Sequence, residues 1–288
     1  MKNTVKNPVN IPVEKLRPFE GHPFKVKDDE EMNTLIESVQ TTGILSPLIV
    51  RPIESTEEYE VISGHRRLHA AVKAGITEVP ALIYALDRDS AAIAVVDSNL
   101  HREHILPSEK AFAYKLKMEA LSHQGKRTDL TSCQLGTKLR TDEMMAENSN
   151  DSARQIQRYI RLTYLIPEFL DKMDNGEIAL SVGVELSFLD EQSQYDVLEQ
   201  CEINDCTPSY SQAFRMHKAD REGLLTKACI EGIMCEEKAN QKEKIKVSAE
   251  RLRAVLPKGM DSQKTEDFII RACEHYHKYL RNRDRDSR

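Results

Sequence analysis

The sequence predicts an α+β domain followed by helices alone, and two observations support that prediction. Helical and strand-like patterns alternate over residues 20–95, which is typical of a small α+β domain. After residue 106 no strand pattern can be recognised, and apolar residues recur at helical spacing. Because 288 residues suffice for two or three domains, we expect an α+β domain over residues 1–105, an all-α domain over 106–205 and a helical region over 206–288.

The α+β domain is expected to begin with a strand and then to alternate. Met32, Leu35, Ile36 and Val39 recur at helical spacing, and Gly43 ends that pattern. Short β-branched runs between polar turns indicate strands. The elements predicted in order are a strand over 9–13, a helix over 29–42, strands over 47–53 and 59–62, a helix over 64–74, a strand over 80–85 and a helix over 89–100.

The rest of the chain is expected to be helical. Ser108 is a suitable N-cap for a helix that carries Ala111, Phe112 and Tyr114. A stretch rich in Gly, Lys, Thr and Ser over 122–141 predicts a loop. Further helices are predicted over 141–147, 152–162 and 168–176, as a pair over 180–201, and over 209–253 and 268–281.

The composition narrows the class of protein. Hydrophobic residues make up 40% of the chain and charged residues 31%, which indicates a helix-rich globular protein. No stretch approaches the ~20 apolar residues of a membrane span, and the polar start of the chain lacks the apolar core of a signal peptide. The six cysteines are scattered at spacings unlike those of zinc sites. We therefore expect a cytoplasmic protein with free thiols.

Residues 61–71 predict a strand that turns directly into a helix, with Gly64 at the turn and Arg66 and Arg67 in the first helical turn. A glycine lets backbone N–H groups approach an anion closely, and a helix N-terminus carries about half a positive charge. Arginine adds paired donors that match phosphate oxygens. The segment thus predicts a phosphate-binding turn. The alternative is a solvated helix end whose arginines pair with nearby carboxylates.

The order and spacing of these segments resemble the N-terminal domain of ParB-type chromosome and plasmid partition proteins. The resemblance spans roughly residues 10–190. It rests on the helix that Gly43 ends, on Gly64-His65-Arg66-Arg67, on 75–83 and on 97–103. In the family the second and last of these motifs read Gly-Glu-Arg-Arg and Glu-Asn-x-x-Arg. The resemblance implies a ParB/sulfiredoxin-like α+β domain followed by an all-α helix-turn-helix domain.

The family binds CTP with a divalent metal in this domain, so the resemblance implies CTP with Mg²⁺ here. Two positions depart from the family: His65 stands where a glutamate is common, and Ser98 where a carboxylate helps to hold the metal. A hydroxyl is a poorer Mg²⁺ ligand. We therefore expect at most slow CTP hydrolysis and assign no catalytic or metal-binding residue. The resemblance places at the nucleotide Gly43, Ser46, Gly64, His65, Arg66, Arg67, Asn99 and Arg102.

Two predicted helices, over 141–147 and 152–162, flank a polar turn in the pattern of a helix-turn-helix. In the second helix Arg154, Arg158 and Arg161 share one face. No acidic residue lies between 152 and 165, although the chain has a net charge of −6, and DNA affinity depends on such a local basic face. A solvated helix face is the alternative. The residues expected to bind DNA are Ser152, Arg154, Gln155, Gln157, Arg158 and Arg161.

The leading hypothesis is a sequence-specific DNA-binding protein of ParB type, acting in plasmid or chromosome partition or in the maintenance of a mobile element. The first alternative is a nucleotide hydrolase or nuclease with the same N-terminal fold. The second is a transcription regulator that has lost nucleotide binding, which Ser98 favours over the hydrolase. Sulfiredoxin-like chemistry requires a thiol, and no cysteine precedes Cys133.

A nuclease would normally use a cluster of carboxylates to hold metal ions. The nearby acidic run 28–31 is expected instead to form the first turn of a helix, where acids favour the helix dipole. His101 and His104 have a spacing that metal ligands use, but solvated or phosphate-facing side chains are the simpler interpretation. The sequence therefore gives the nuclease no clear metal centre.

The expected partners are double-stranded DNA, a second copy of the chain and a ParA-type ATPase, with no membrane, in a cytoplasmic and nucleoid-associated protein. Members of the family act as dimers. An apolar stripe on the last helix predicts self-association through the C-terminal region, and it consists of Phe268, Ile269, Ile270, Cys273, Tyr276 and Leu280. The alternative is that this stripe packs inside its own chain.

Overall fold

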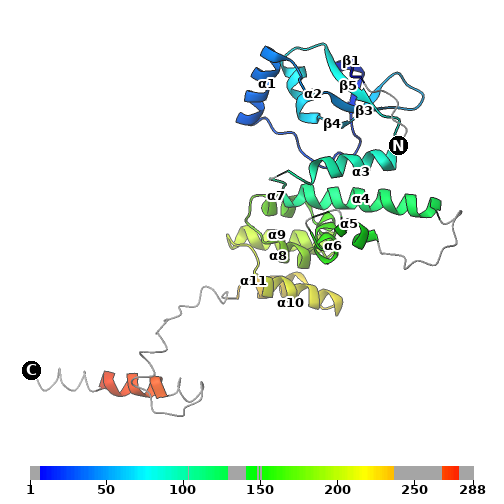
Figure 1. Ribbon diagram of the computed structural model, residues 1–288. Coiled ribbons are helices and arrows are strands. Elements are labelled where there is room, and N and C mark those ends of the chain that lie inside the picture. Colours follow the sequence, from blue (N-terminus) through cyan, green and yellow to red (C-terminus); the bar gives the residue numbers. More distant parts are fainter. Residues whose placement is uncertain are drawn as a thin grey trace, which may run out of the picture. The chain divides into compact units, whose positions relative to one another are not determined.

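The computed structural model describes residues 7–102, 104–128, 141–147, 149, 151–236 and 268–278. The chain divides into two compact units, Met1–Glu236 and Glu237–Arg288. In the first unit an α+β domain is followed by helices, which confirms the predicted fold class (Figure 1). Within the described part of the chain, no strand follows residue 83.

The α+β domain is built on one five-stranded sheet in the order β1-β5-β3-β4-β2. Pairs β1–β5 and β3–β4 are antiparallel, whereas β3–β5 and β2–β4 are parallel. The strands are β1 (Val9–Pro12), β2 (Leu16–Pro18), β3 (Leu48–Pro52), β4 (Tyr59–Ser63) and β5 (Glu78–Ile83). Strand β4 passes through Gly64 into helix α2 (His65–Lys73), so the sheet itself positions the turn that the sequence singled out.

Helices cover both faces of the sheet. On one face α1 (Glu30–Thr42) and α2 pack together over a core that includes Met32, Ala70 and Val61. On the other face α3 (Arg88–Asn99) packs against Ile62. Val61 and Ile62 therefore enter opposite cores, as the two-residue period of a strand requires.

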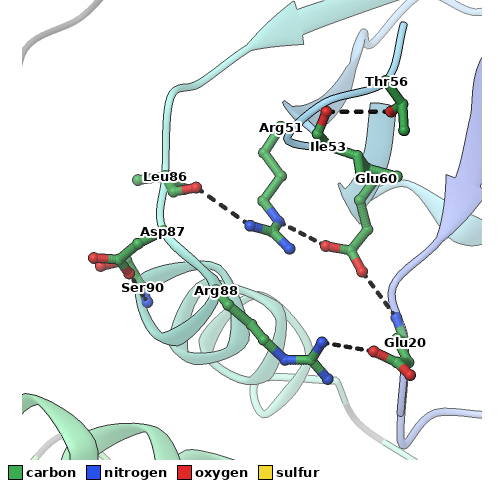
Figure 2. A network of polar contacts seen from close by, with 9 residues as sticks. All are labelled: Glu20, Arg51, Ile53, Thr56, Glu60, Leu86, Asp87, Arg88 and Ser90. Atoms are coloured by element: carbon green, nitrogen blue, oxygen red, sulfur yellow. Dashed lines mark hydrogen bonds and ion pairs between the residues drawn. The ribbon is translucent and has the colours of Figure 1, made fainter. Parts of the chain in front are cut away.

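A polar network ties the sheet to the start of α3 (Figure 2). Arg51 on β3 donates to the Glu60 carboxylate on β4, and its other arm reaches the carbonyl of Leu86 at 3.5 Å. Glu60 also accepts from the backbone N–H of Glu20 at 3.0 Å, and the Glu20 carboxylate pairs with Arg88 at 2.6 Å. The buried Glu60 carboxylate is thus fully engaged in fixing the chain around the sheet.

The helical part of the first unit is organised around α4, which packs against α3, α6 and α7. Phe169, Leu186, Met216 and Ile230 lie at the centre of its largest core. The helices are α4 (Pro107–Thr128), α5 (Thr141–Glu147), α6 (Ala153–Arg161), α7 (Pro167–Asp174), α8 (Leu180–Leu186), α9 (Glu191–Ile203), α10 (Tyr210–Arg221) and α11 (Lys227–Met234). Two 3-10 helices, η1 (Val13–Lys15) and η2 (Leu162–Tyr164), complete the elements.

Two elements differ from the sequence-based expectations. Helix α4 continues to Thr128, so the loop predicted from residue 122 was wrong in its first part, while 129–140 lie outside the described residues. The three-residue strand β2 was missed. Residues 268–278 are helical, as predicted. Residues 237–253, Leu280 and Arg281 lie outside the described residues.

Candidate functional site

Residues from three separate segments meet at the start of α2. They line a cavity of about 200 Å³. Six of the eight residues that the family resemblance assigned to a nucleotide are among them. The lining comprises His22, Phe24, Lys25, Val26, Ser63, Gly64, His65, Arg66, Arg67, Asn99 and Arg102. We call this cavity the arginine pocket.

Gly64 is the only residue type that fits its position without strain. Its φ of +104° lies in the left-handed region, which L side chains rarely adopt. A Cβ there would also lie 3.1 Å from the Leu48 side chain and 3.2 Å from Arg67 Nη2. Among the residues that the structure describes, no side chain caps the N-terminus of α2. The first backbone amides of the helix are thus left without the usual capping acceptor and are suited to an anion.

The two adjacent arginines have different roles. Arg67 is half-buried, and its Nη1 donates to the carbonyls of Ser46 and Pro47, the latter at 3.0 Å. Burial lowers the pKa of the Arg67 guanidinium, but an arginine remains charged. Arg66 instead reaches Glu31 at 3.2 Å and Asp29 at 3.8 Å on α1. Arg67 therefore holds the turn before β3 in place, and Arg66 is held by exposed carboxylates that an anionic ligand could replace.

Ser46 and Gly43 do not line the arginine pocket through their side chains. Ser46 contributes its backbone carbonyl to Arg67. Gly43 ends α1 with a φ of +76°, and its N–H donates to the carbonyl of Val39 at 3.0 Å. Both residues shape the approach to β3.

A pair of imidazoles forms part of the pocket wall. The ring centroids of His22 and His65 lie 3.7 Å apart. His22 Nδ1 donates to the Phe24 carbonyl at 2.8 Å, while the Nε2 atoms of both rings are buried and make no hydrogen bond within the described residues. Burial, together with the neighbouring His22 ring, lowers the pKa of His65 to about 3, and burial also lowers the pKa of His22, so both rings are neutral at pH 7.

The end of α3 supplies Asn99 and the residues around it. Asn99 Nδ2 donates to the Val95 carbonyl at 2.8 Å and to Ser98 Oγ at 3.2 Å. Ser98 Oγ in turn donates to the Val95 carbonyl at 3.0 Å. Asp97 points to Lys117 on α4, with 2.5 Å between Oδ1 and Nζ. The carboxylate next to Ser98 is therefore committed to the α3–α4 contact.

A larger cavity of about 670 Å³ shares Lys25, Arg66 and Arg102 with the arginine pocket. Beyond these three cations it is lined by Lys27, Asp29, Glu31, His104, Ile105, Leu106 and Glu109. Glu109 shapes its wall by accepting from the backbone N–H of Lys25 at 2.8 Å and of Leu106 at 3.2 Å. The two cavities together offer room for an anionic group and for a larger attached group.

The acidic run at the start of α1 serves the fold. Asp29 caps the helix by accepting from Met32 N at 2.8 Å, and Asp28 pairs with His69 and Lys73. Among the described residues, no group of three or more His, Cys, Asp or Glu side chains is arranged to hold a metal ion. The expectation that these acids form a helix start is confirmed.

The predicted second helix of the helix-turn-helix is α6, and its N-terminus opens onto a groove. Ser152 caps it by accepting from Gln155 N at 3.3 Å. Ile156 is fully buried against Met145 of α5 and Tyr114 of α4. The resulting cavity of about 530 Å³ is lined by Ser152, Arg154, Gln155, Arg158, Ser181, Val184, Glu185 and Tyr210. We call it the α6 groove.

Two of the residues expected to bind DNA have partners outside α6. Gln157 donates to Asp142 on α5. Arg161 donates to the carbonyl of Ser187 at 2.7 Å, and its guanidinium lies 4.1 Å from the ring centroid of Phe188. The spacing of the three arginines correctly put Arg154 and Arg158 together, whereas Arg161 ties the end of α6 to α8.

Several lining residues were missed by reasoning from the sequence. His22, Phe24 and Lys25 belong to an irregular segment between β2 and α1, and no periodic pattern marks them. Ser181, Val184 and Glu185 lie on α8, and Tyr210 begins α10. Only the packing of these segments brings them to the two cavities.

Among the described residues, no helix is both long and apolar enough to cross a membrane.

The α+β part of the chain holds the arginine pocket, and the helical part of the first unit holds the α6 groove. Residues 1–100 match the family of the ParB N-terminal domain. The chain is 33% identical over 171 residues to the chromosome-partitioning protein Spo0J of Thermus thermophilus. The aligned residues cover 59% of this chain and 56% of that relative. The chain is 39% identical over 111 residues to the nucleoid occlusion protein of Geobacillus thermodenitrificans, covering 38% of this chain and 39% of the relative.

The chain thus spans about half the length, or less, of these curated relatives. Among solved structures, the chain is similar to the C-terminally truncated ParB of Caulobacter crescentus complexed to the centromeric parS site. That similarity has a TM-score of 0.43 at 22% identity, over 78% of this chain and 98% of the other. The same ParB complexed with CTP-γ-S gives a TM-score of 0.31 at 24% identity, over 67% of this chain and 97% of the other.

Proposed function

We propose that this protein binds DNA sequence-specifically through the α6 groove. The observation that carries the proposal is the convergence of Arg154 and Arg158 with Ser152 and Gln155 on one groove at the start of a capped helix. Arginine pairs with the O6 and N7 atoms of guanine, and glutamine with adenine, in the major groove. Gln157 and Arg161 act as positioning residues, because Asp142 and Ser187 already hold their side chains.

The arginine pocket is proposed to bind the phosphates of a nucleoside triphosphate, CTP with Mg²⁺ by family resemblance. Gly64, His65 and Arg66 provide the turn and its charge, Arg67 keeps the turn in place, and Asn99 and Arg102 close the pocket from the end of α3. Gly43 and Ser46 support it from the segment before β3. Support comes from the uncapped helix N-terminus and the cluster of three arginines in a chain of net charge −6.

The biological role proposed is DNA partition, of a chromosome, a plasmid or a mobile element, in a nucleoid-associated dimer that works with a ParA-type ATPase. The relatives named as chromosome-partitioning and nucleoid occlusion proteins support this role. The proposed parts are a nucleotide-sensing domain over 1–105, a helix-turn-helix domain over 106–205 and a self-associating region over 206–288. A transcription regulator without nucleotide binding is the second candidate, because Ser98 replaces the metal-holding carboxylate of the family.

The DNA-binding proposal is tested by selection from a library of duplexes with a randomised core. Native protein is expected to enrich one sequence. Arg154→Ala and Arg158→Ala are each expected to weaken binding to that duplex by about 1–3 kcal/mol. Arg215→Ala, which removes an exposed arginine paired with Glu236, serves as the control and should bind as native does. Unchanged affinity in both α6 variants, with native circular dichroism, would refute the assignment.

A further inference from the structure

One carboxylate lies among the arginines of the α6 groove. Glu185 on α8 lines the groove together with Arg154 and Arg158. The one side-chain hydrogen bond of Glu185 within the described residues is on Oε2, from His217 Nδ1 on α10, at 2.7 Å. A carboxylate facing a polyanion costs affinity through repulsion, unless it meets a donor there. A groove that binds a polyanion therefore gains from Glu185 only where its carboxylate meets such a donor.

A continuous stack of planar groups fixes this carboxylate. The Arg161 guanidinium lies 4.1 Å from the Phe188 ring centroid. Phe188 stacks on the His217 ring at 4.2 Å with an interplanar angle of 1°, and His217 holds Glu185. The side chains of Glu185 and His217 are only 15% and 16% exposed. Arg161 is anchored by Ser187, so the stack orients Glu185 rigidly from the end of α6.

The hydrogen bond from His217 occupies Oε2 of Glu185 and leaves Oε1 available. Because an ionised carboxylate only accepts hydrogen bonds, the donor in the pair is His217 Nδ1. Oε1 has no hydrogen-bond partner among the described residues. In the major groove, cytosine presents its N4 amino group as a donor, whereas the N6 amino group of adenine lies beside the N7 acceptor, which repels a carboxylate. A fixed, ionised acceptor therefore discriminates in favour of cytosine.

We propose that Glu185 is a specificity-determining residue that accepts a hydrogen bond from the N4 amino group of a cytosine in the bound DNA, with His217 as its positioning residue. The inference rests on the proposed DNA-binding function. With this proposal, α8 joins α6 in contacting the bases. The contact from α8 is made by a negatively charged side chain, whereas those from α6 are made by positively charged side chains. Arg154 or Arg158 would then read a guanine close to the cytosine.

The test compares base preferences of native protein, Glu185→Gln and Glu185→Ala in selections from a library of duplexes with a randomised core. The carboxamide keeps the acceptor for His217 but adds an amino group, which pairs with adenine N7. We expect Glu185→Gln to shift one position from cytosine toward adenine, with a change of roughly tenfold in relative affinity at that position alone. Glu185→Ala and His217→Ala should lose discrimination there. Glu199→Gln, which removes an exposed carboxylate paired with Lys227, should select as native does.

Each outcome decides between the alternatives. If Glu185→Gln and Glu185→Ala keep the native preference at every position, Glu185 only joins α8 to α10 and the inference is wrong. If both variants bind all duplexes more tightly by the same factor, the carboxylate is merely repulsive, which also overturns it. If native protein enriches no sequence, the proposed DNA-binding function fails and this inference fails with it. If one of Glu185→Gln, Glu185→Ala and His217→Ala does not fold, the other two variants decide, because each changes the contact of Glu185 in a different way.

Discussion

Arg51 and Glu60 are directly opposite each other on β3 and β4, with 2.6 Å between Nε and Oε2. Their side chains are 14% and 7% exposed, so neither charge is solvated in the way that a surface ion pair is. Glu60 also accepts from the backbone of Glu20 (Figure 2). Removing one partner of a buried pair leaves the other charge without compensation, which costs more than the pair itself contributes.

The first prediction follows from this pair. Glu60→Ala is expected to lower the free energy of unfolding by about 3–5 kcal/mol, measured by urea denaturation of the full chain. The matched control is Glu58→Ala, which breaks an exposed pair with Arg17 and should lower the free energy of unfolding much less, because water screens that pair. Equal losses in the two variants would show that burial does not govern the contribution of Glu60.

The second prediction concerns the pH dependence of stability. Because burial lowers the pKa of His65 to about 3 in the folded state, the unfolded chain binds a proton at this residue near pH 6.5 while the folded chain does not. Stability from this source is complete above about pH 6.5 and falls as the pH decreases from about 6.5 toward about 3. Between about pH 7 and 5 the expected loss is about 2 kcal/mol.

Urea denaturation of native protein and of His65→Gln across this pH range measures the effect. The variant should lose stability less steeply than native protein, with the difference appearing below about pH 6.5. Parallel pH profiles for the two proteins would mean that the His65 ring is solvated and titrates normally.

The third prediction is that the C-terminal region mediates self-association. Phe268 and Ile270 on the helix over 268–278 are 37% and 51% exposed, and we expect this apolar face to pair with a second copy. Light scattering should give a dimer for the full chain and a monomer for a chain that ends at residue 257. A monomer in both cases, or a dimer in both, would remove the helix as the interface.

The fourth prediction concerns Ser98. Restoring a carboxylate with Ser98→Glu should tighten nucleotide binding in the presence of Mg²⁺ but not in its absence, since hard cations prefer charged oxygen ligands. Calorimetric titration with CTP, with and without Mg²⁺, measures this difference. The matched control is Ser90→Glu at the opposite end of α3. An equal response of both variants to Mg²⁺ would place the metal elsewhere.

The sequence predicted the elements that have strong local signals. The strand-to-helix turn at Gly64 was recognisable from local residues. A left-handed φ and a close approach of the backbone to neighbouring atoms both require glycine, and the residues that follow it form a helix. The roles of Arg67 and Arg161 were not recognisable, because their partners are backbone carbonyls from distant segments. The same holds for His22 and Glu185, which tertiary packing alone brings to their sites. Helix α4 passes the predicted loop start because His123 and Gln124 contact Asp89 and Ser90 at the start of α3, and such tertiary contacts override weak helix propensity.

Isothermal titration of the full chain with CTP in the presence of Mg²⁺ measures whether the arginine pocket binds a nucleoside triphosphate. Native protein is expected to bind CTP, with ATP and GTP as comparisons. Arg66→Ala should abolish this binding, because Arg66 is the pocket arginine with only exposed carboxylates as partners. The salt dependence of non-specific DNA binding should not change in that variant, since it depends on the α6 groove. No heat of binding for native protein with any of the three nucleotides at millimolar concentration would contradict the account.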